Sequence, residues 1–299
     1  MKKWIEAARP KTLTAALVPI LAGTALARAS GYAPKLSLSL FALLSAFCIQ
    51  IGTNLFNDAI DFKKGTDNET RIGPRRVTQS GLLSSRAVML GGAFFFLLAA
   101  AFGIPLLIAG GSVILSIGIL SLICGYAYTG GPFPLAYLGL GELFVILFFG
   151  LAAVGGVFYL HTGLLPDTRS MVAGLQVGFL STVLIAINNL RDAEGDKKTD
   201  KRTLAVRFGK TFARREIALL AILPAFMGIY WIWVGLLWAG FLPLLILPLA
   251  FHISNNVART EPGPTYNRFL GQAALLHLLF GLLFSLGCLL SWYAPGGGS

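Results

Sequence analysis

A cluster of amide and acidic side chains ends one of the long apolar runs of this chain. Asn54, Asp58 and Asp61 are spaced i, i+4, i+7, and Asn57 lies four residues before Asp61. On a helix this spacing places the side chains on one face, and Asp67 follows shortly after the helical pattern ends. Mg²⁺ takes one or two carboxylates and completes its shell with water and phosphate oxygens. The cluster therefore has the donors that a hard cation needs.

A second cluster of the same kind lies far downstream. Asn188, Asp192 and Asp196 are spaced i, i+4, i+8, which predicts one face of a helix that continues beyond the membrane. Carboxylates where a membrane helix meets its loop are costly unless something binds them. One such cluster could equally be a set of solvated loop carboxylates. Two clusters beside Lys and Arg favour a divalent metal site whose opposing faces hold a diphosphate through bridging Mg²⁺.

Basic residues follow both clusters, and a stretch rich in Tyr and Gly lies between them at 126–132. Arg can hold phosphate oxygens through paired hydrogen bonds, and Lys acts as a point charge. A topological signal or contact with anionic lipid is the alternative for each basic residue. The predicted diphosphate contacts are Lys63, Arg71, Arg76, Tyr128, Lys201 and Arg202.

Composition predicts an all-α, polytopic membrane protein. The 299 residues are 56% hydrophobic and 12% charged, with a mean hydropathy of +0.74, and a soluble domain would carry roughly twice that share of charge. Each transmembrane helix needs about 20 apolar residues. The runs predict nine spans, at about 12–29, 36–56, 86–107, 110–128, 135–158, 170–190, 214–235, 238–255 and 269–292.

The distribution of Lys and Arg predicts the orientation. With the N-terminus inside, all of the 24 basic residues except Arg28, Lys35 and Arg169 fall on inner segments. Basic residues concentrate in cytoplasmic loops, so we expect both clusters to face the cytoplasm and the C-terminus to lie outside. The net charge of +11 thus follows membrane topology and does not indicate a nucleic-acid partner. Glu142, a carboxylate in an apolar helix, should face a cavity or bond a neighbouring helix rather than lipid.

Six stretches together resemble the UbiA superfamily of intramembrane prenyltransferases, and most of all its naphthoate-prenylating branch. The usual first motif of the superfamily ends in an Asp where this chain has Gly65, and Asp67 comes two residues later. That departure is typical of the naphthoate branch and leaves the role of Asp67 open. The stretches lie at 8–13, 57–67, 71–76, 128–132, 188–192 and 201–209.

The resemblance implies a single domain over 1–299, with nine helices around a central cavity that opens sideways to lipid. Loops at 54–85 and 188–213 would cap it on the cytoplasmic side of the plasma membrane. It also implies Mg²⁺-dependent transfer of a polyprenyl group from its diphosphate to 1,4-dihydroxy-2-naphthoate, with loss of CO₂. The implied roles are catalysis for Asn57, Asp61, Asn188 and Asp192, metal binding for Asn54, Asn57, Asp58, Asp61, Asp67, Asp192 and Asp196, and acceptor binding for Arg9, Lys11, Glu142, Asn188 and Arg191.

Three alternatives stay open. The donor could be phytyl diphosphate, or the acceptor another aromatic ring, within the same superfamily. A different class, an ion-coupled transporter, would also carry buried carboxylates. Transporter carboxylates gather near the bilayer midplane, whereas these lie at the cytoplasmic ends of their helices beside cations suited to phosphate, which favours the enzyme.

Overall fold

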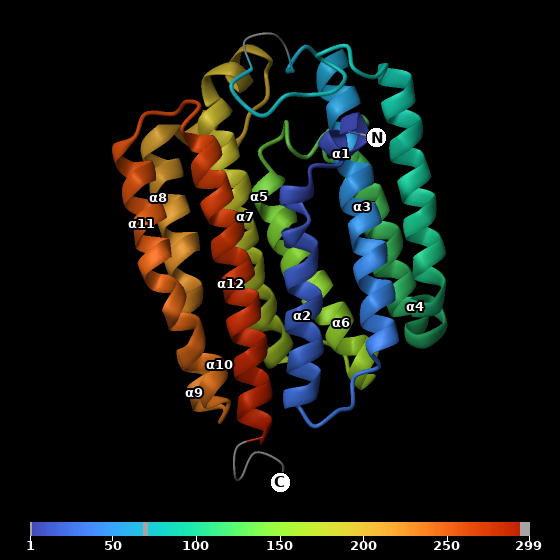
Figure 1. Ribbon diagram of the computed structural model, residues 1–299, viewed down its shortest axis with the longest axis vertical. Coiled ribbons are helices and arrows are strands. Elements are labelled where there is room, and N and C mark those ends of the chain that lie inside the picture. The colour runs from blue at the N-terminus through green and yellow to red at the C-terminus, as the bar shows by residue number, and fades with distance from the viewer. Residues whose placement is uncertain (1, 68–70, 294–299) are drawn as a thin grey trace.

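The apolar runs of the sequence form helices that stand side by side in a bundle (Figure 1). The computed structural model describes residues 2–67 and 71–293, with the side chain of Lys11 outside the description. In chain order the elements are α1 Lys2–Ala8, η1 Pro10–Thr12, α2 Thr14–Ala29, α3 Leu36–Lys63, α4 Ser85–Ala127, α5 Gly141–Val145, η2 Ile146–Ala152, α6 Ala153–Thr162, α7 Thr168–Lys198, α8 Leu204–Phe226, α9 Ile229–Trp233, α10 Leu237–Phe241, η3 Leu242–Ile246, α11 Leu247–Arg259 and α12 Tyr266–Tyr293.

Seven helical segments in the described part of the chain are long and apolar enough to cross a membrane, and α2 is shorter, with 16 residues. The predicted count of nine is thus not confirmed, although the all-helical membrane architecture is. One reason is that α4 joins two of the predicted spans. A straight helix of its 43 residues would be roughly 65 Å long, about twice the hydrocarbon core of a bilayer. Gly111, with φ 59° and ψ −144°, breaks α4 into two arms, and Figure 1 shows them folding back on each other.

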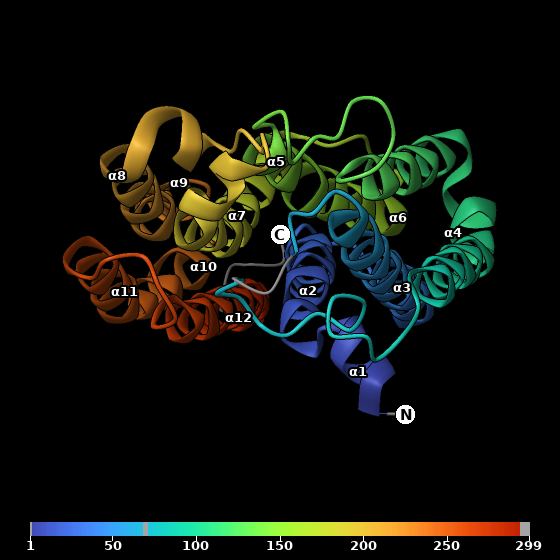
Figure 2. The ribbon, with the colours of Figure 1, turned by 90° about the horizontal axis from the view of Figure 1, so that it is seen from above.

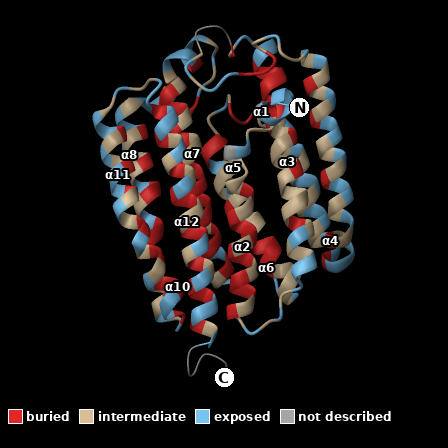
Figure 3. Ribbon diagram, in the orientation of Figure 1, coloured by how far each residue is buried: buried red, intermediate tan, exposed pale blue. Residues whose placement is uncertain are grey.

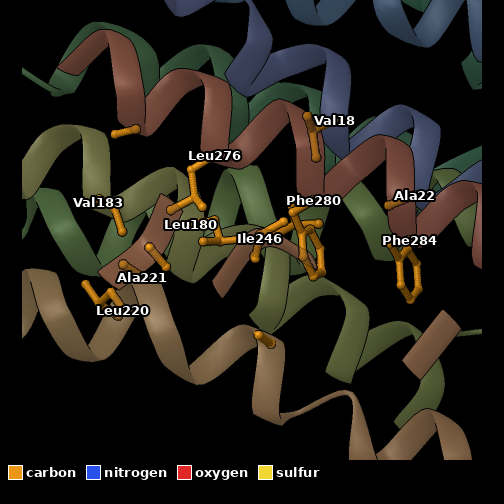
Figure 4. Packing of buried hydrophobic residues seen from close by; sticks show 14 of the residues in the cluster. Val18, Ala22, Leu180, Val183, Leu220, Ala221, Ile246, Leu276, Phe280 and Phe284 are labelled. Carbon is orange, nitrogen blue, oxygen red and sulfur yellow. The ribbon is translucent and has the colours of Figure 1, made fainter. Parts of the chain in front are cut away.

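The most buried span is α7, and its position organises the bundle. In the most apolar 18-residue stretch of each span, 67% of the residues are buried in α7, against 17% in α3 and 11% in α4. Figure 3 shows buried residues gathered on the central helices and exposed ones on α4. The largest apolar cluster lies between α7, α8 and α12, where Leu180, Leu276 and Phe280 meet (Figure 4). The C-terminal helices, together with α2 and α6, therefore form the packed core, and α3 and α4 are left to face lipid and a cavity.

The loops that carry the two clusters lie at one end of the bundle. Helix α1, residues 64–67 and residues 71–84 are at the top of Figure 1, and α12 ends at the bottom. Seen from above, the first of these loops crosses from the α3 side towards α12 (Figure 2). Both clusters and α1 thus lie at the same end of the bundle.

Close packing of η2 against α7 depends on glycines, and a methyl group at Gly150 should test it. A Cβ there would collide with the backbone oxygen of Gly174 and with the backbone of Gly178. We expect Gly150→Ala to cost about 1–3 kcal/mol of stability and to lower the unfolding midpoint in detergent. Gly103→Ala is the matched control, because a Cβ at Gly103 meets nothing within 4 Å. Equal midpoints for both variants would contradict the packing described.

Candidate active site

The first cluster lies on the last turns of α3, as its spacing predicted. Both oxygens of the Asp58 carboxylate accept backbone N–H groups of the following loop, from Thr78 at 3.0 Å and Val77 at 3.2 Å. The amide of Asn54 donates to the carbonyl of Ala8 and to the hydroxyl of Thr12, each at 3.1 Å. These two side chains are buried and already bonded. Their geometry favours anchoring the N-terminal segment and the loop over the metal binding that the sequence predicted.

Asp61 lies next to polar side chains of two loops. Its Oδ1 accepts a hydrogen bond of 2.9 Å from the hydroxyl of Tyr137, and its Oδ2 lies 4.0 Å from the guanidinium of Arg76. The Tyr137 hydroxyl is also 2.7 Å from that of Thr66. Burial, and then the charge of Asp61, raises the pKa of Tyr137. The phenol therefore keeps its proton and donates a hydrogen bond to the carboxylate. Asn57 Oδ1 accepts from the hydroxyl of Thr129 at 2.8 Å.

Asp67 is held by two arginines of its own loop. It forms ion pairs with Arg71 and with Arg76, whose Nε lies 2.9 Å from the carboxylate. Burial raises the pKa of Asp67 to about 6 even though Arg71 acts to lower it. The side chain therefore loses its charge, and its ion pairs weaken, as the pH falls through about 6. Gly65 and Asp67 thus belong to a loop that is closed by its own opposite charges.

The second cluster is built around Arg191 on α7. Its guanidinium holds both oxygens of Asp192, at 2.8 and 2.6 Å, and also donates to Asn188 and to Asn267 of α12, each at 2.7 Å. The Arg191 side chain is fully buried. A planar guanidinium suits such paired contacts with a carboxylate. Sequence analysis predicted that Arg191 binds the acceptor, whereas this geometry places it as the support that orients Asp192 and Asn188.

Lys201 links the two clusters electrostatically. Its Nζ lies 3.3 Å from the carboxylate of Asp196. Burial alone would lower the pKa of Lys201, but the neighbouring charges of Asp196, Asp61 and Asp192 outweigh it and raise the pKa. The Lys201 ammonium also lies 6.0 Å from the centre of the Tyr137 ring, and the hydroxyl of Tyr137 bonds Asp61, so Lys201 is near carboxylates of both clusters. It stays charged, as a phosphate contact must.

Tyr137 is the functional candidate that sequence analysis missed. Its hydroxyl bonds Asp61, and the centre of its ring lies 4.1 Å from the ammonium nitrogen of Lys64 and 6.0 Å from that of Lys201. Cations over an aromatic face are attracted to its negative quadrupole. The signal available was its place in the loop that follows Tyr128, on the same side as both clusters. The predicted span 135–158 includes Tyr137, whereas in the structure Tyr137 lies in the loop between α4 and α5.

The first loop closes over the second cluster. Asn267 donates to the carbonyl of Ile72 at 3.3 Å, and Gly73 lies so near Arg191 and Arg71 that a Cβ there would press on both guanidinium groups. A side chain at this position would have to displace these guanidinium groups from their present contacts. The two clusters, far apart in sequence, are therefore brought together under one cap.

The remaining predicted residues lie at different distances from this centre. Glu142 is buried, accepts from Asn189 at 2.7 Å, and so bonds a neighbouring helix. Arg202 is exposed and pairs with Asp200, and Lys63 is exposed at the end of α3. Arg9 has a left-handed backbone (φ 52°). Burial, and then the charge of Arg71, lowers its pKa, while Asp58, Asp67 and Asp61 act against this. The side chain of Lys11 lies outside the described residues.

A largely apolar cavity extends from the site into the bundle, between α2, α3, α4, η2 and α6. Gln50, Thr53 and Tyr128 line it next to the clusters, and Ile20, Ala42 and Leu160 line it farther along. Burial, followed by the charges of Glu142 and Asp61, raises the pKa of Tyr128, so its hydroxyl is neutral. A charged head group and a long hydrocarbon chain would both find suitable surroundings here.

The donors suit Mg²⁺ although no three His, Cys, Asp or Glu side chains of the described residues gather in one metal-binding group. Mg²⁺ needs only one or two carboxylates when phosphate and water supply the rest of its shell. Asp61, Asp192 and Asp196 offer carboxylates, and Asn57 and Asn188 offer amide oxygens. One oxygen of Asp196 is buried without a hydrogen bond among the described residues. The oxygen-only set fits a hard cation.

Comparison with known proteins agrees with this fold. The model of the UbiA prenyltransferase family matches residues 16–269. A 1,4-dihydroxy-2-naphthoate octaprenyltransferase of Haemophilus influenzae is 34% identical over 97% of this chain and 96% of its own length. The protein of the same name from Escherichia coli is 36% identical over 97% of this chain and 96% of its own.

Solved structures share the fold. A UbiA homolog from Archaeoglobus fulgidus, solved with GPP and Mg²⁺, superposes with a TM-score of 0.64 at 19% identity, over 95% of this chain and 99% of that one. A UbiA homolog from Aeropyrum pernix gives 0.69 at 15% identity, over 93% and 97%. Helices around a cavity capped by two acidic clusters define a multi-pass membrane prenyltransferase. The chain belongs to the UbiA prenyltransferase family.

The anchoring role of Asp58 can be tested by hydrogen exchange. Asp58→Ala removes the acceptor of the Val77 and Thr78 amides, so residues 77–83 should exchange faster by at least about tenfold, as expected when a buried bond worth about 1–3 kcal/mol is lost. Asp200→Ala, which removes an exposed carboxylate, is the control and should leave this segment unchanged. Protection equal to the wild type in Asp58→Ala would contradict the role.

Proposed function

We propose that this protein transfers a polyprenyl group from its diphosphate to 1,4-dihydroxy-2-naphthoate, with loss of CO₂, to give demethylmenaquinol for menaquinone biosynthesis. The observation that carries the proposal is a chain of contacts at the mouth of an apolar cavity: Lys201 meets Asp196 and the ring of Tyr137, and the hydroxyl of Tyr137 bonds Asp61. The named activity of the relatives supports the acceptor. The cap and the N-terminus lie on the cytoplasmic side of the plasma membrane, where a soluble acceptor can enter.

Catalysis rests on stabilising the departing diphosphate. Lys201 and Arg76 lie beside the carboxylates of both clusters and would hold its oxygens, while its tail lies in the cavity. Mg²⁺, bound by Asp61, Asp192 and Asp196 with Asn57 and Asn188 nearby, would offset the negative charge of the leaving group. Arg71, Lys63, Arg202 and Tyr128 complete the proposed surroundings of the diphosphate.

The bonds then change in a simple order. The allylic C–O bond breaks and its electron pair leaves with the diphosphate, in a site whose fixed charges need no rearrangement. The electron-rich naphthoate ring forms the new C–C bond at the carbon bearing the carboxylate. The C–CO₂ bond breaks, its electron pair returns to the ring, and aromaticity is restored. Because CO₂ takes the place of a leaving proton, this sequence needs no general base.

Residues around the acceptor are proposed on position. Arg9 has a buried Nη2 without a hydrogen bond among the described residues, near the first cluster, which makes it our preferred partner for the naphthoate carboxylate. Lys11 is a second candidate. Glu142 and Arg191 act indirectly, through Asn189 and through Asp192 and Asn188. Asp67 closes the cap with Arg71 and Arg76, and Asn54 and Asp58 anchor it.

A phytyl donor is the second candidate, because a 2-carboxy-1,4-naphthoquinone phytyltransferase of Synechocystis is 28% identical over 96% of this chain. The identity is lower than with the octaprenyltransferases, so the longer polyprenyl tail is favoured. Membership of a prenyltransferase family speaks against the transporter alternative.

Removing one carboxylate from either cluster should abolish transfer. Asp61→Ala and Asp192→Ala each lose a proposed Mg²⁺ ligand, and we expect at least about a hundredfold loss of kcat, as when a group that stabilises the transition state is removed. Glu194→Ala is the control, because Glu194 lies on the same helix near Asp192 but is exposed. Thermal unfolding in detergent checks that each variant is folded. Turnover near the wild-type rate in either folded variant would remove that residue from the metal site.

Substrate identity can be tested in liposomes with 1,4-dihydroxy-2-naphthoate, Mg²⁺ and geranylgeranyl, phytyl or longer diphosphates, with products identified by mass. We expect a decarboxylated prenyl-naphthoquinone that disappears with EDTA and returns with added Mg²⁺. Transfer only to 4-hydroxybenzoate would keep the family and reject the acceptor. Activity that persists through chelation would reject the metal.

A further inference from the structure

We infer that a polar cluster of Thr24, Ser39 and His161 is the floor of the cavity for the prenyl tail and sets the donor length beyond which the cavity adds no further binding. This inference rests on the proposed function and extends it to donor specificity. The three residues come from α2, α3 and α6, which are far apart in sequence.

The cluster is joined by its own hydrogen bonds. Ser39 Oγ lies 2.9 Å from His161 Nε2 and 2.9 Å from Thr24 Oγ1, and the Thr24 hydroxyl is 3.4 Å from the same imidazole nitrogen. Ser39 is thus the centre of the network. Because each of the three residues belongs to a different helix, these bonds connect α2, α3 and α6 at this level.

Its position follows from the direction of each helix. Ile20, Ala42 and Leu160 line the far part of the cavity. Thr24 lies one turn beyond Ile20 on α2, Ser39 lies nearly one turn before Ala42 on α3, which runs the opposite way, and His161 directly follows Leu160 on α6. All three polar side chains therefore lie just past the apolar lining, at the end away from the two clusters.

An apolar layer separates the cluster from the cavity. Ile20, Ala42, Leu106 and Val157 pack against one another and also line the cavity. The three polar side chains beyond this layer are partly buried, and His161 Nδ1 is buried without a hydrogen-bond partner among the described residues. The polar network therefore begins where the apolar lining ends.

A hydrocarbon tail gains binding as it covers apolar wall and loses it where it displaces hydrogen bonds. A tail that reaches past the floor would separate Ser39 from His161 and cover both polar groups with hydrocarbon, which is costly. Asp61 and Ser39 are 22 residues apart on α3, which corresponds to roughly 33 Å along the helix. Tails longer than this span must leave the cavity sideways into lipid.

The wild-type protein provides the first test, with a series of prenyl diphosphates that grow by one isoprenyl unit and with 1,4-dihydroxy-2-naphthoate as acceptor. We expect kcat/KM to rise with each added unit and then to level off. A continued rise through the longest donor, or no dependence on length, would overturn the floor.

Two variants test whether the cluster sets the donor length at which kcat/KM levels off. Ser39→Ala removes the central oxygen of the network, and His161→Leu replaces the imidazole by an apolar side chain of similar size. In both, the levelling-off should move to donors at least one unit longer, with about a tenfold gain in kcat/KM for those donors relative to the shorter ones. Ser116→Ala is the matched control, because Ser116 is exposed and bonds only within its own helix.

The outcomes separate the two proposals. If the wild type transfers no prenyl group from any donor, the proposed function fails. If the wild type is active and the folded variants level off at the same length, the floor is wrong and the proposed function stands. Should His161→Leu not fold, Ser39→Ala decides alone, since it deletes a single atom that lies in a hydrogen-bonded contact and carries no charge.

Discussion

The structure depends on one constraint: carboxylates buried at the edge of a membrane must be paired. Asp58 is paired by backbone N–H groups, Asp67 by Arg71 and Arg76, and Asp192 by Arg191. Each pairing fixes a different segment, so the cost of burying charge is what orders the cap. Asp61 and Asp196 differ from these, because their partners Arg76 and Lys201 are residues that we propose to contact the diphosphate.

The apolar half of the site explains why this chemistry takes place in a membrane. The packed core lies between α7, α8 and α12, and the cavity is left between the less buried helices on the other side. A hydrocarbon tail can therefore enter where the protein itself packs least. The head group meets fixed charges at the cap, and the tail exchanges one apolar environment for another.

Much of this arrangement could be predicted from the sequence, because it depends on local patterns. The helical faces that carry Asp61 and Asp192, the common side of both loops and the membrane spans follow from spacing, charge and hydropathy. Contacts between distant segments could not be predicted in this way. Tyr137 reaches Asp61 across 76 positions, Arg191 meets Asn267 of α12, and Asp58 bonds a loop rather than facing the cavity. The break at Gly111, in contrast, lies where the predicted spans 86–107 and 110–128 meet, and the two arms of α4 correspond to these spans.

The ion pairs of Asp67 also bear on the order in which the protein is made. Asp67, Arg71 and Arg76 belong to one loop, between α3 and α4, so the carboxylate of Asp67 finds its partners before α7 has been synthesised. A chain made from its N-terminus can thus insert its first helices with this carboxylate already paired. The second cluster arrives only with α7 and the loop that follows it, which carry Asp192 and Lys201. A half-made protein therefore lacks one half of the proposed site.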